Sequence, residues 1–329
     1  MATVVGNENL RDLWNELSAS RGDHLFLTCE DRAGHRCSFT YGEFDRLVNR
    51  TANFLRLAGV KKGDNVAIQL YNSPEYVSAT FALAKIGAVA VPINMQLVFG
   101  ECAFQFDRCA IRTVICEPDC QGYYFADAMP PCPNNTCGKR RVYPMERVFV
   151  CHSGGEGLVA GAVDFDAGVD ACADVLDERC DLDGQDTAMI IFTSGTTGTS
   201  KGVMLSHHNI TFNLTEMCQM IYIGPEDTFL SVLPLHHAYE CTCGFLCQIY
   251  RGSTIAYCEG LRYIMKNMKE VHPTMILCVP LLIETMYHKI WANLRKNGME
   301  KMVKKALAAS NASRKIGIDL RKKLFSEIH

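Results

Sequence analysis

Residues 193–202 form the segment of this chain best suited to bind and act on an anion. Six of its ten residues carry hydroxyl groups, three are glycine, and one, Lys201, carries a positive charge. Glycines let backbone N–H groups turn toward an anion, hydroxyls add hydrogen-bond donors, and lysine adds a point charge. Short strand-like runs flank the segment at 188–192 and 203–206. Because surface linkers seldom lie between buried strands, we interpret the segment as a phosphate-binding loop.

The Walker A loop does not account for this segment. Aligned on Lys201, that pattern requires glycine at position 200 and a hydroxyl residue at 202, where this chain has Ser200 and Gly202. The segment resembles instead the phosphate-binding signature of adenylate-forming (AMP-binding) enzymes. That signature has two hydroxyl residues, Gly, two more hydroxyl residues, Gly, any residue, Pro or Ser, and then Lys-Gly. The segment matches it at every position.

This resemblance implies that the loop binds ATP. The residues implied to hold its phosphates are Thr193, Ser194, Gly195, Thr196, Thr197, Gly198 and Lys201. Thr193, at the head of the loop, is also the implied contact of Mg²⁺, a cation that prefers phosphate oxygens and few protein ligands. Lys201 is implied to be catalytic, because donors around the β- and γ-phosphates stabilise charge on the leaving pyrophosphate.

A second candidate segment spans residues 233–240 and reads Leu-Pro-Leu-His-His-Ala-Tyr-Glu. It resembles a Pro-Leu-x-His-x-aromatic motif of the same superfamily. The resemblance implies that His237 is a catalytic and substrate-binding residue and that Tyr239 also contacts the acid substrate. Two other interpretations stay open. His236 and His237 with Glu240 could ligate a metal, although the H-E-x-x-H order is absent, or His237 is an ordinary helix-start histidine.

Further blocks resemble the superfamily along most of the chain. Residues 39–44, 63–67 and 85–94 resemble its early blocks, whereas 273–280 and 315–325 resemble long-chain fatty acyl-CoA synthetases. The implied reaction is ATP-dependent activation of a medium- or long-chain fatty acid to an acyl-adenylate, followed by transfer to the thiol of coenzyme A (CoA). An acyl-carrier-protein ligase, an aryl-CoA ligase and a non-catalytic phosphate-binding module remain as alternatives.

The later blocks of the superfamily have no match in this chain. They include the adenine-binding segment, the acidic partner of magnesium, the ribose-binding aspartate and the small C-terminal domain with its lysine. We therefore expect residues 1–329 to be an incomplete N-terminal adenylation domain, inactive alone, whose partner is the missing remainder of its own chain. The expected subdomains are 62–221, which carries the loop, and 1–61 plus 222–329.

A strand–helix–strand unit at residues 66–93 is the clearest predicted structure. Pro74 stands at the first helical position and Gly87 just past the helix end, which is the asymmetry typical of helices. Such a unit predicts parallel strands with a right-handed crossover. Strands and helices alternate again after the loop. The sequence thus predicts an α/β fold of layered, mostly parallel sheets flanked by helices, as in the N-terminal domain of acyl-CoA synthetases.

Other elements follow from hydrophobic periodicity. Helices are predicted at 8–20, 40–57, 209–221, 238–250, 261–271 and 280–294, and strands at 24–29, 35–41, 113–117, 147–151, 228–234, 253–258 and 274–279. Thr40 with Glu43 forms a capping-box signature, and Asn209 is the predicted cap of its helix. Residues 161–168 do not predict a helix, so the near-match to a dinucleotide fingerprint at 155–160 is attributed to chance.

Composition excludes some classes of partner. The net charge of −3 gives no general case for binding nucleic acid.

The N-terminus lacks a basic head and an apolar signal core, and no run is long enough to span a bilayer, so we expect a cytoplasmic protein. Seventeen cysteines without C-x-x-C spacing favour reduced structural thiols over a metal cluster. The proline-, cysteine- and asparagine-rich stretch at 129–137 is expected to be a surface excursion.

Residues 299–329 predict a helical segment rich in lysine and arginine. Eight basic residues stand against three acidic ones. A solvated basic face is the plainer interpretation, and a helix that contacts an anionic membrane surface is the sharper one. Peripheral membrane contact through 299–329 is therefore a second hypothesis for this segment.

Overall fold

The structure of the protein is a computed structural model that describes residues 8–30, 34–125, 142–155, 157–177, 180–193, 200–315 and 319. The chain divides into two compact units, Met1–Leu277 and Cys278–His329. All strands of the described residues lie in the first unit. The expected surface excursion at 129–137 lies outside the described residues.

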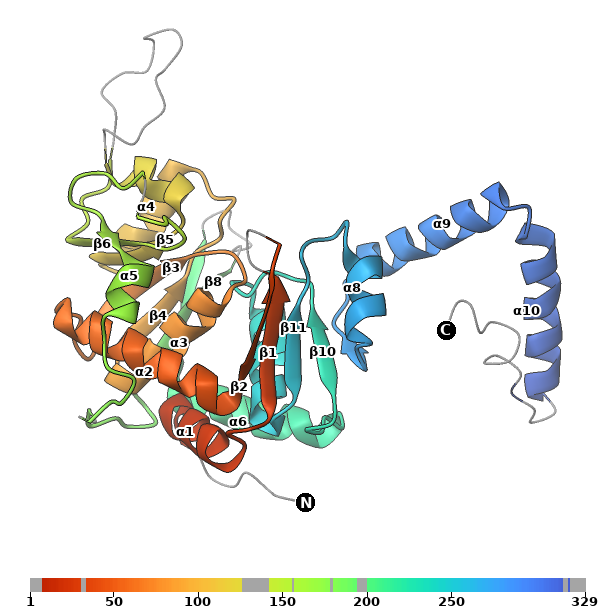
Figure 1. Cartoon of the computed structure of the whole chain (residues 1–329), viewed down its shortest axis with the longest axis horizontal. Coiled ribbons are helices and arrows are strands. Elements are labelled where there is room, and N and C mark those ends of the chain that lie inside the picture. Colours follow the sequence, from red (N-terminus) through yellow and green to blue (C-terminus); the bar gives the residue numbers. More distant parts are fainter. Residues whose placement is uncertain are drawn as a thin grey trace, which may run out of the picture. The chain divides into compact units, whose positions relative to one another are not determined.

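A seven-stranded sheet forms one layer of the first unit (Figure 1). Its strands, in spatial order, are β7 (Val163–Asp164), β6 (Arg147–Val150), β5 (Thr113–Cys116), β3 (Asn65–Gln69), β4 (Val89–Pro92), β8 (Thr187–Thr193) and β9 (Lys201–Ser206). Neighbouring strands are parallel except for β8 and β9, which pair antiparallel on either side of the predicted phosphate loop.

A five-stranded sheet forms a second layer. Its spatial order is β12 (Met275–Ile276), β10 (Thr228–Ser231), β11 (Thr254–Tyr257), β1 (Leu25–Glu30) and β2 (Arg36–Thr40). Only the β1–β2 pair is antiparallel among these described strands. Layered, mostly parallel sheets are therefore confirmed as the fold. The predicted division into 62–221 and the rest stays a prediction, although the seven-stranded sheet falls within 62–221.

Helices surround and separate the sheets. In the first unit they are α1 (Leu10–Ser20), α2 (Tyr41–Leu57), α3 (Pro74–Ile86), α4 (Phe99–Arg108), the 3₁₀ helix η1 (Pro118–Tyr123), α5 (Phe165–Asp170), α6 (His207–Met220), the π-helix η3 (Glu240–Leu246), α7 (Cys247–Arg251) and α8 (Ile264–Val271). The second unit contains α9 (Pro280–Lys296) and α10 (Glu300–Lys315). Among the described helices, none has the length and apolar character to cross a membrane.

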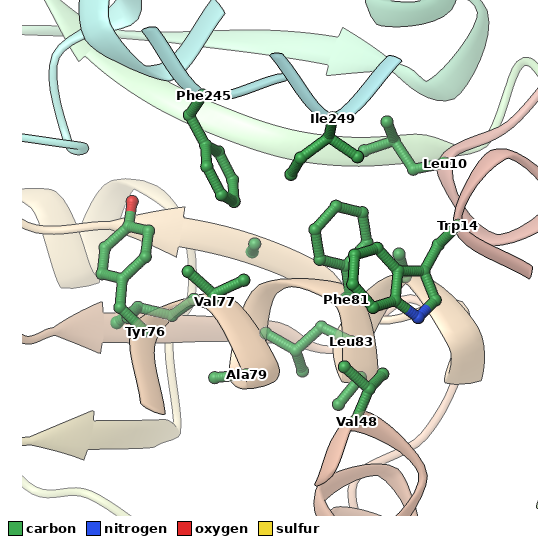
Figure 2. Packing of buried hydrophobic residues seen from close by; sticks show 14 of the residues in the cluster. Leu10, Trp14, Val48, Tyr76, Val77, Ala79, Phe81, Leu83, Phe245 and Ile249 are labelled. Atoms are coloured by element: carbon green, nitrogen blue, oxygen red, sulfur yellow. The ribbon is translucent and has the colours of Figure 1, made fainter. Parts of the chain in front are cut away.

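Helix α3 is buried on all sides, as an apolar helix between two layers must be. Ser73 caps it, Pro74 opens it, and Gly87 ends it in a left-handed conformation (φ 75°), as predicted. Its Phe81 stacks on Trp14 of α1 with ring centroids 4.5 Å apart, and Phe245 of η3 lies beyond it at 6.1 Å (Figure 2). Helix α3 therefore packs against both α1 and η3 in the core.

Strands of the seven-stranded sheet alternate their side chains between two cores. Val66 and Ile68 of β3 belong to the core that contains α3, whereas Ala67 belongs to the core that contains Phe106 of α4. Burial on both faces explains why these strands read as continuous apolar runs in the sequence. Cysteines share these cores: burial raises the pKa of the Cys102 thiol to about 12, so it behaves as a small apolar residue.

Three predicted elements differ from the structure. Residues 165–170 form the short helix α5, because Asp164 caps it by accepting from the Ala167 N–H at 2.9 Å. Helix α6 is capped by Ser206 rather than Asn209, and the two form a reciprocal capping box at 3.1 Å. The helix predicted at 238–250 begins at Glu240 as a π-helix, which hydrophobic periodicity alone does not distinguish from an α-helix.

Candidate active site

The carboxyl ends of parallel strands from both sheets face one cavity of about 540 Å³. Open parallel sheets bind ligands at this edge. Most lining residues lie at the carboxyl ends of strands or directly after them: Cys29 and Glu30 at β1, 70–75 after β3, 94–96 after β4, Glu117 after β5, His152 after β6, 231–234 and 236–237 at the end of β10, and 257–260 at the end of β11. Cys37 and Phe39 of β2 complete the wall. The two layers of the first unit thus build the cavity together.

The two described residues of the predicted phosphate loop that were assigned roles, Thr193 and Lys201, lie at the same sheet edge. Strand β8 runs parallel to β4, so Thr193 at its end lies on the edge from which 94–96 enter the cavity wall. Lys201 begins β9 directly opposite Thr193 in the antiparallel register, and both side chains are exposed. The other five predicted phosphate contacts, Ser194, Gly195, Thr196, Thr197 and Gly198, lie outside the described residues.

His237 lines the cavity with an exposed side chain, whereas Tyr239, which is 50% exposed, is not among the lining residues. The ring of His237 lies 4.2 Å from that of His236, measured between centroids. Burial, helped by the charge of His237, lowers the pKa of His236 to about 4, so His236 is neutral at pH 7. Only one of the two predicted acid contacts therefore faces this cavity.

Asn72 holds the His237 segment from the side of β3, which sequence reasoning missed. Its side-chain N–H donates to the carbonyl of Leu233 at 2.8 Å, and its side-chain oxygen accepts from the Leu235 N–H at 2.9 Å. One amide therefore bridges the two sheets at the cavity. Within the described residues, no group of three His, Cys, Asp or Glu side chains could hold a metal ion, so the metal interpretation of 236–240 gains no support.

His152 forms a second feature that the sequence did not reveal. Its Nδ1 lies 3.0 Å from Glu117 Oε2 and its Nε2 lies 2.9 Å from Glu75 Oε2. Burial alone would lower the pKa of His152, but the hydrogen bonds and charges of the two glutamates outweigh burial and raise it to about 10. His152 is therefore a cation that donates from both ring nitrogens, and it ties the start of α3 to the ends of β5 and β6 at the cavity.

Glu240 is the third feature missed. It is fully buried, and Ser231 Oγ donates to its Oε1 at 2.5 Å. Burial raises the pKa of Glu240 to about 7, and the hydrogen bond from Ser231 only partly opposes this rise. In the sequence, Glu240 was considered only as a possible metal ligand with His236 and His237, and its burial and its bond to Ser231 were not predicted.

Comparison with known proteins decides the family. The profile of the family described as AMP-binding enzyme matches residues 15–324. The chain belongs to the AMP-binding enzyme family. A crotonobetaine/carnitine–CoA ligase of Proteus mirabilis (strain HI4320) is 30% identical over 286 residues, which cover 86% of this chain and 53% of that enzyme. The chain therefore spans about half the length of the curated AMP-binding relatives that it matches.

Solved structures share the fold. A fatty acyl CoA synthetase of Mycobacterium tuberculosis superposes with a TM-score of 0.69 at 21% identity, over 85% of this chain and 51% of that one. The ATP-bound structure of MatB from Rhodopseudomonas palustris gives a TM-score of 0.65 at 23% identity, over 84% and 50%. At these identities the likeness concerns the fold alone. It confirms the predicted relation to the N-terminal domain of acyl-CoA synthetases.

Proposed function

We propose that the protein is an AMP-forming acid–thiol ligase. A carboxylate oxygen of the acid attacks the α-phosphorus of ATP, pyrophosphate leaves, and the sulfur of CoA then attacks the acyl carbon as AMP leaves. One observation carries this proposal. Thr193 ends β8 and Lys201 begins β9, so both lie at the end of the sheet that faces the cavity lined by His237. Membership of the AMP-binding family supports it.

The proposed roles follow from the chemistry of each side chain. Lys201 and the loop N–H and hydroxyl groups stabilise the negative charge that gathers on pyrophosphate. His237 orients the carboxylate of the acid from the cavity wall, and Tyr239 is its proposed companion. Mg²⁺ would fit here because it needs few protein ligands beside phosphate oxygens, and the Thr193 hydroxyl would supply one of them. When bound, it would neutralise part of the phosphate charge.

For the acid, we propose a medium- or long-chain fatty acid as the first candidate. The blocks at 273–280 and 315–325 support it, as do apolar cavity side chains such as Phe39, Leu70 and Met95. A second candidate is an acid that carries a quaternary ammonium group, because relatives at 30–31% identity are named crotonobetaine/carnitine–CoA ligases. The charges of the cavity wall do not separate the two candidates. Glu75 and Glu117 pair with the cationic His152, and Glu30 and Glu259 pair with Lys266 at 3.3 and 2.9 Å.

The decisive assay measures acid-dependent pyrophosphate exchange and acyl-hydroxamate formation. It compares a medium-chain fatty acid, a long-chain fatty acid and carnitine, on the full reading frame that contains these residues and on residues 1–329 alone. The first candidate predicts that the fatty acids react, and the second predicts that carnitine does. Failure of all three acids with the full reading frame contradicts both, and activity of 1–329 contradicts the expectation that it is inactive alone.

Lys201→Ala should lower the adenylation rate by about 10²–10³-fold, because it removes a charge that acts on the leaving pyrophosphate. The measurement is pyrophosphate exchange at saturating acid. The matched control is Lys62→Ala, since Lys62 precedes β3 at the opposite end of the sheet, where it pairs with Asp186 at 2.8 Å. Equal rates for Lys201→Ala and the unmodified protein would remove Lys201 from the mechanism.

We also propose peripheral membrane contact through 299–329. The described part of this segment, α10, carries Lys301, Lys304, Lys305, Arg314 and Lys315. Each lysine or arginine near an anionic surface contributes about 1 kcal/mol. Replacing Lys301 and Lys305 by glutamate should therefore weaken cosedimentation with phosphatidylserine vesicles at least about tenfold. Unchanged cosedimentation would leave α10 with a solvated basic face only.

A further inference from the structure

Glu240 has a buried carboxyl group that no cation neutralises among the described residues. Its side chain is 0% exposed, Oε1 accepts from Ser231 Oγ at 2.5 Å, and Oε2 has no hydrogen-bond partner in the described part of the chain. Burying a carboxyl group without a cation costs free energy unless the group stays uncharged and hydrogen-bonded. Neither the loop nor the His237 motif explains why a glutamate stands here.

The π-helix η3 is shaped around this carboxyl group. Gly244 lies one turn on, and a Cβ at that position would come within 2.6 Å of the Glu240 carboxyl carbon. A side chain at this position would displace the Glu240 carboxyl group, and glycine lets the backbone lie close to it. π-Helical turns are rare and frequently lie at functional sites, so the surroundings of Glu240 are a candidate for function.

The groups around Glu240 are all uncharged at neutral pH. Tyr257 on β11 and the thiols of Cys241 and Cys243 on η3 interact with its charge, and Tyr76 on α3 lies behind them, next to Tyr257 and Cys241. The hydroxyl of Tyr257 is itself buried and unpartnered in the described residues. An ionised Glu240 would thus face phenols and thiols that carry no positive charge. Only water could stabilise its negative charge.

The hydrogen bond of Glu240 closes the loop that presents His237. Ser231 is the last residue of β10, and residues 232–239, which include the cavity-lining His236 and His237, follow before η3 begins at Glu240. The Ser231–Glu240 bond joins the two ends of this loop, while Asn72 holds its middle through Leu233 and Leu235. For water to reach an ionised Glu240, the Ser231–Glu240 hydrogen bond that joins the two ends of this loop would have to break.

We propose that Glu240 is a positioning residue: as an uncharged acid bonded to Ser231, it closes the 231–240 loop and so presents His237 to the substrate acid. The proposal rests on the proposed function, since it assigns Glu240 a part in binding that acid. Glu240 does not line the cavity, so its effect on the acid passes through the loop that carries His237. Ionisation of Glu240, which its pKa of about 7 places near neutrality, loosens the loop and weakens acid binding.

Two substitutions separate positioning from packing. Glu240→Gln keeps the volume and the acceptor but has no charge to gain, whereas Glu240→Leu is apolar and removes the acceptor. In the adenylation assay, we expect the KM for the acid to rise about tenfold between about pH 6 and pH 8.5 in the unmodified protein and to stay flat in Glu240→Gln. Glu240→Leu should show a KM raised about tenfold at every pH, with kcat within about threefold.

Hydrogen exchange of residues 232–237 provides a measurement that needs no activity. We expect exchange in this segment at least about tenfold faster in Glu240→Leu, unchanged in Glu240→Gln, and unchanged in α2 as an internal reference. Glu146→Gln is the control variant, because Glu146 is exposed and far from the cavity wall. Equal exchange and an equal KM for all variants would overturn the proposal.

The two readouts also distinguish a failure here from a failure of the proposed function. If the unmodified full reading frame adenylates no acid, the proposed function fails, and the exchange data alone decide whether Glu240 closes the loop. If it does adenylate an acid but Glu240→Leu loses only thermal stability, with KM and its pH profile unchanged, Glu240 is a packing residue and the positioning proposal is wrong.

Discussion

His152→Gln should lower the free energy of unfolding by about 3–5 kcal/mol at pH 7, because it leaves two glutamates side by side without their cation. Glu117 is 1% exposed, so water cannot replace the imidazolium beside it. The backbone N–H of residue 152 donates to Asp166 Oδ2 at 2.6 Å, and this bond stays in the variant. His152, Glu75 and Glu117, here called the clamp, tie α3 to the ends of β5 and β6.

The pH dependence of this effect has a definite sign. Because the glutamates raise the pKa of folded His152 from 6.5 to about 10, its contribution to stability is fully present below pH 6.5 and is lost as the pH rises toward 10. At about 1.4 kcal/mol per pKa unit, the whole loss amounts to at most about 5 kcal/mol. In agreement, the hydrogen bond and charge of His152 lower the pKa of Glu75 although burial opposes this.

Urea unfolding between about pH 6 and pH 10 tests both statements. The unmodified protein should lose stability across this range, and His152→Gln should lack that loss. His208→Gln is the matched control, because His208 is exposed at the start of α6. Adding Glu75→Gln and Glu117→Gln to His152→Gln should restore part of the stability. If His152→Gln unfolds at the same urea concentration as the unmodified protein at pH 7, the clamp contributes nothing.

Local signals allowed much of the fold to be predicted. Ser73, Pro74 and Gly87 define both ends of α3 through caps that act within one helical turn, and the structure has them as predicted. The run at β8 was equally clear, because burial of alternate residues in two cores makes a strand apolar throughout. Strand β9 was also predicted, but its residues are exposed or half-buried at the end of the sheet. These two runs also predicted where Lys201 lies, because a loop that connects two paired strands leaves the sheet at the end of the first strand and returns at the start of the second.

Local signals could not predict the clamp around His152 or the buried carboxyl group of Glu240. His152 is separated by 35 residues from Glu117 and by 77 from Glu75, and only the order of β3, β5 and β6 in the sheet brings the three together. Glu240 gave a weak signal, because a π-helix has no periodicity that a short apolar segment could reveal. Pairings that depend on strand order, and polar groups explained by a single buried partner, therefore require the tertiary structure.

Lys85→Met should lower the free energy of unfolding by about 3–5 kcal/mol, because it breaks a buried ion pair. The residues around this pair come from three helices. Lys85 of α3 is 5% exposed, and its Nζ lies 2.6 Å from Asp45 Oδ1 and 2.7 Å from Asn49 Oδ1, both on α2. The indole N–H of Trp14 on α1 donates to the same Asp45 oxygen at 2.7 Å. Methionine keeps the apolar stem of lysine but leaves the carboxylate with neutral donors only.

A double-mutant cycle at pH 7 measures the pair itself. We expect Lys85→Met and Asp45→Leu each to destabilise strongly, and their combination to be less destabilising than the sum, since no charge is then left unpaired. Lys62→Met is the matched control: its ion pair with Asp186 has similar length, 2.8 Å, but the two side chains are 42% and 31% exposed. The Lys62→Met substitution should destabilise the protein far less than Lys85→Met does, and its effect should vanish in high salt. Additive effects at Lys85 and Asp45 would mean that Trp14 and Asn49 satisfy the carboxylate on their own, and that the buried cation serves packing rather than charge balance.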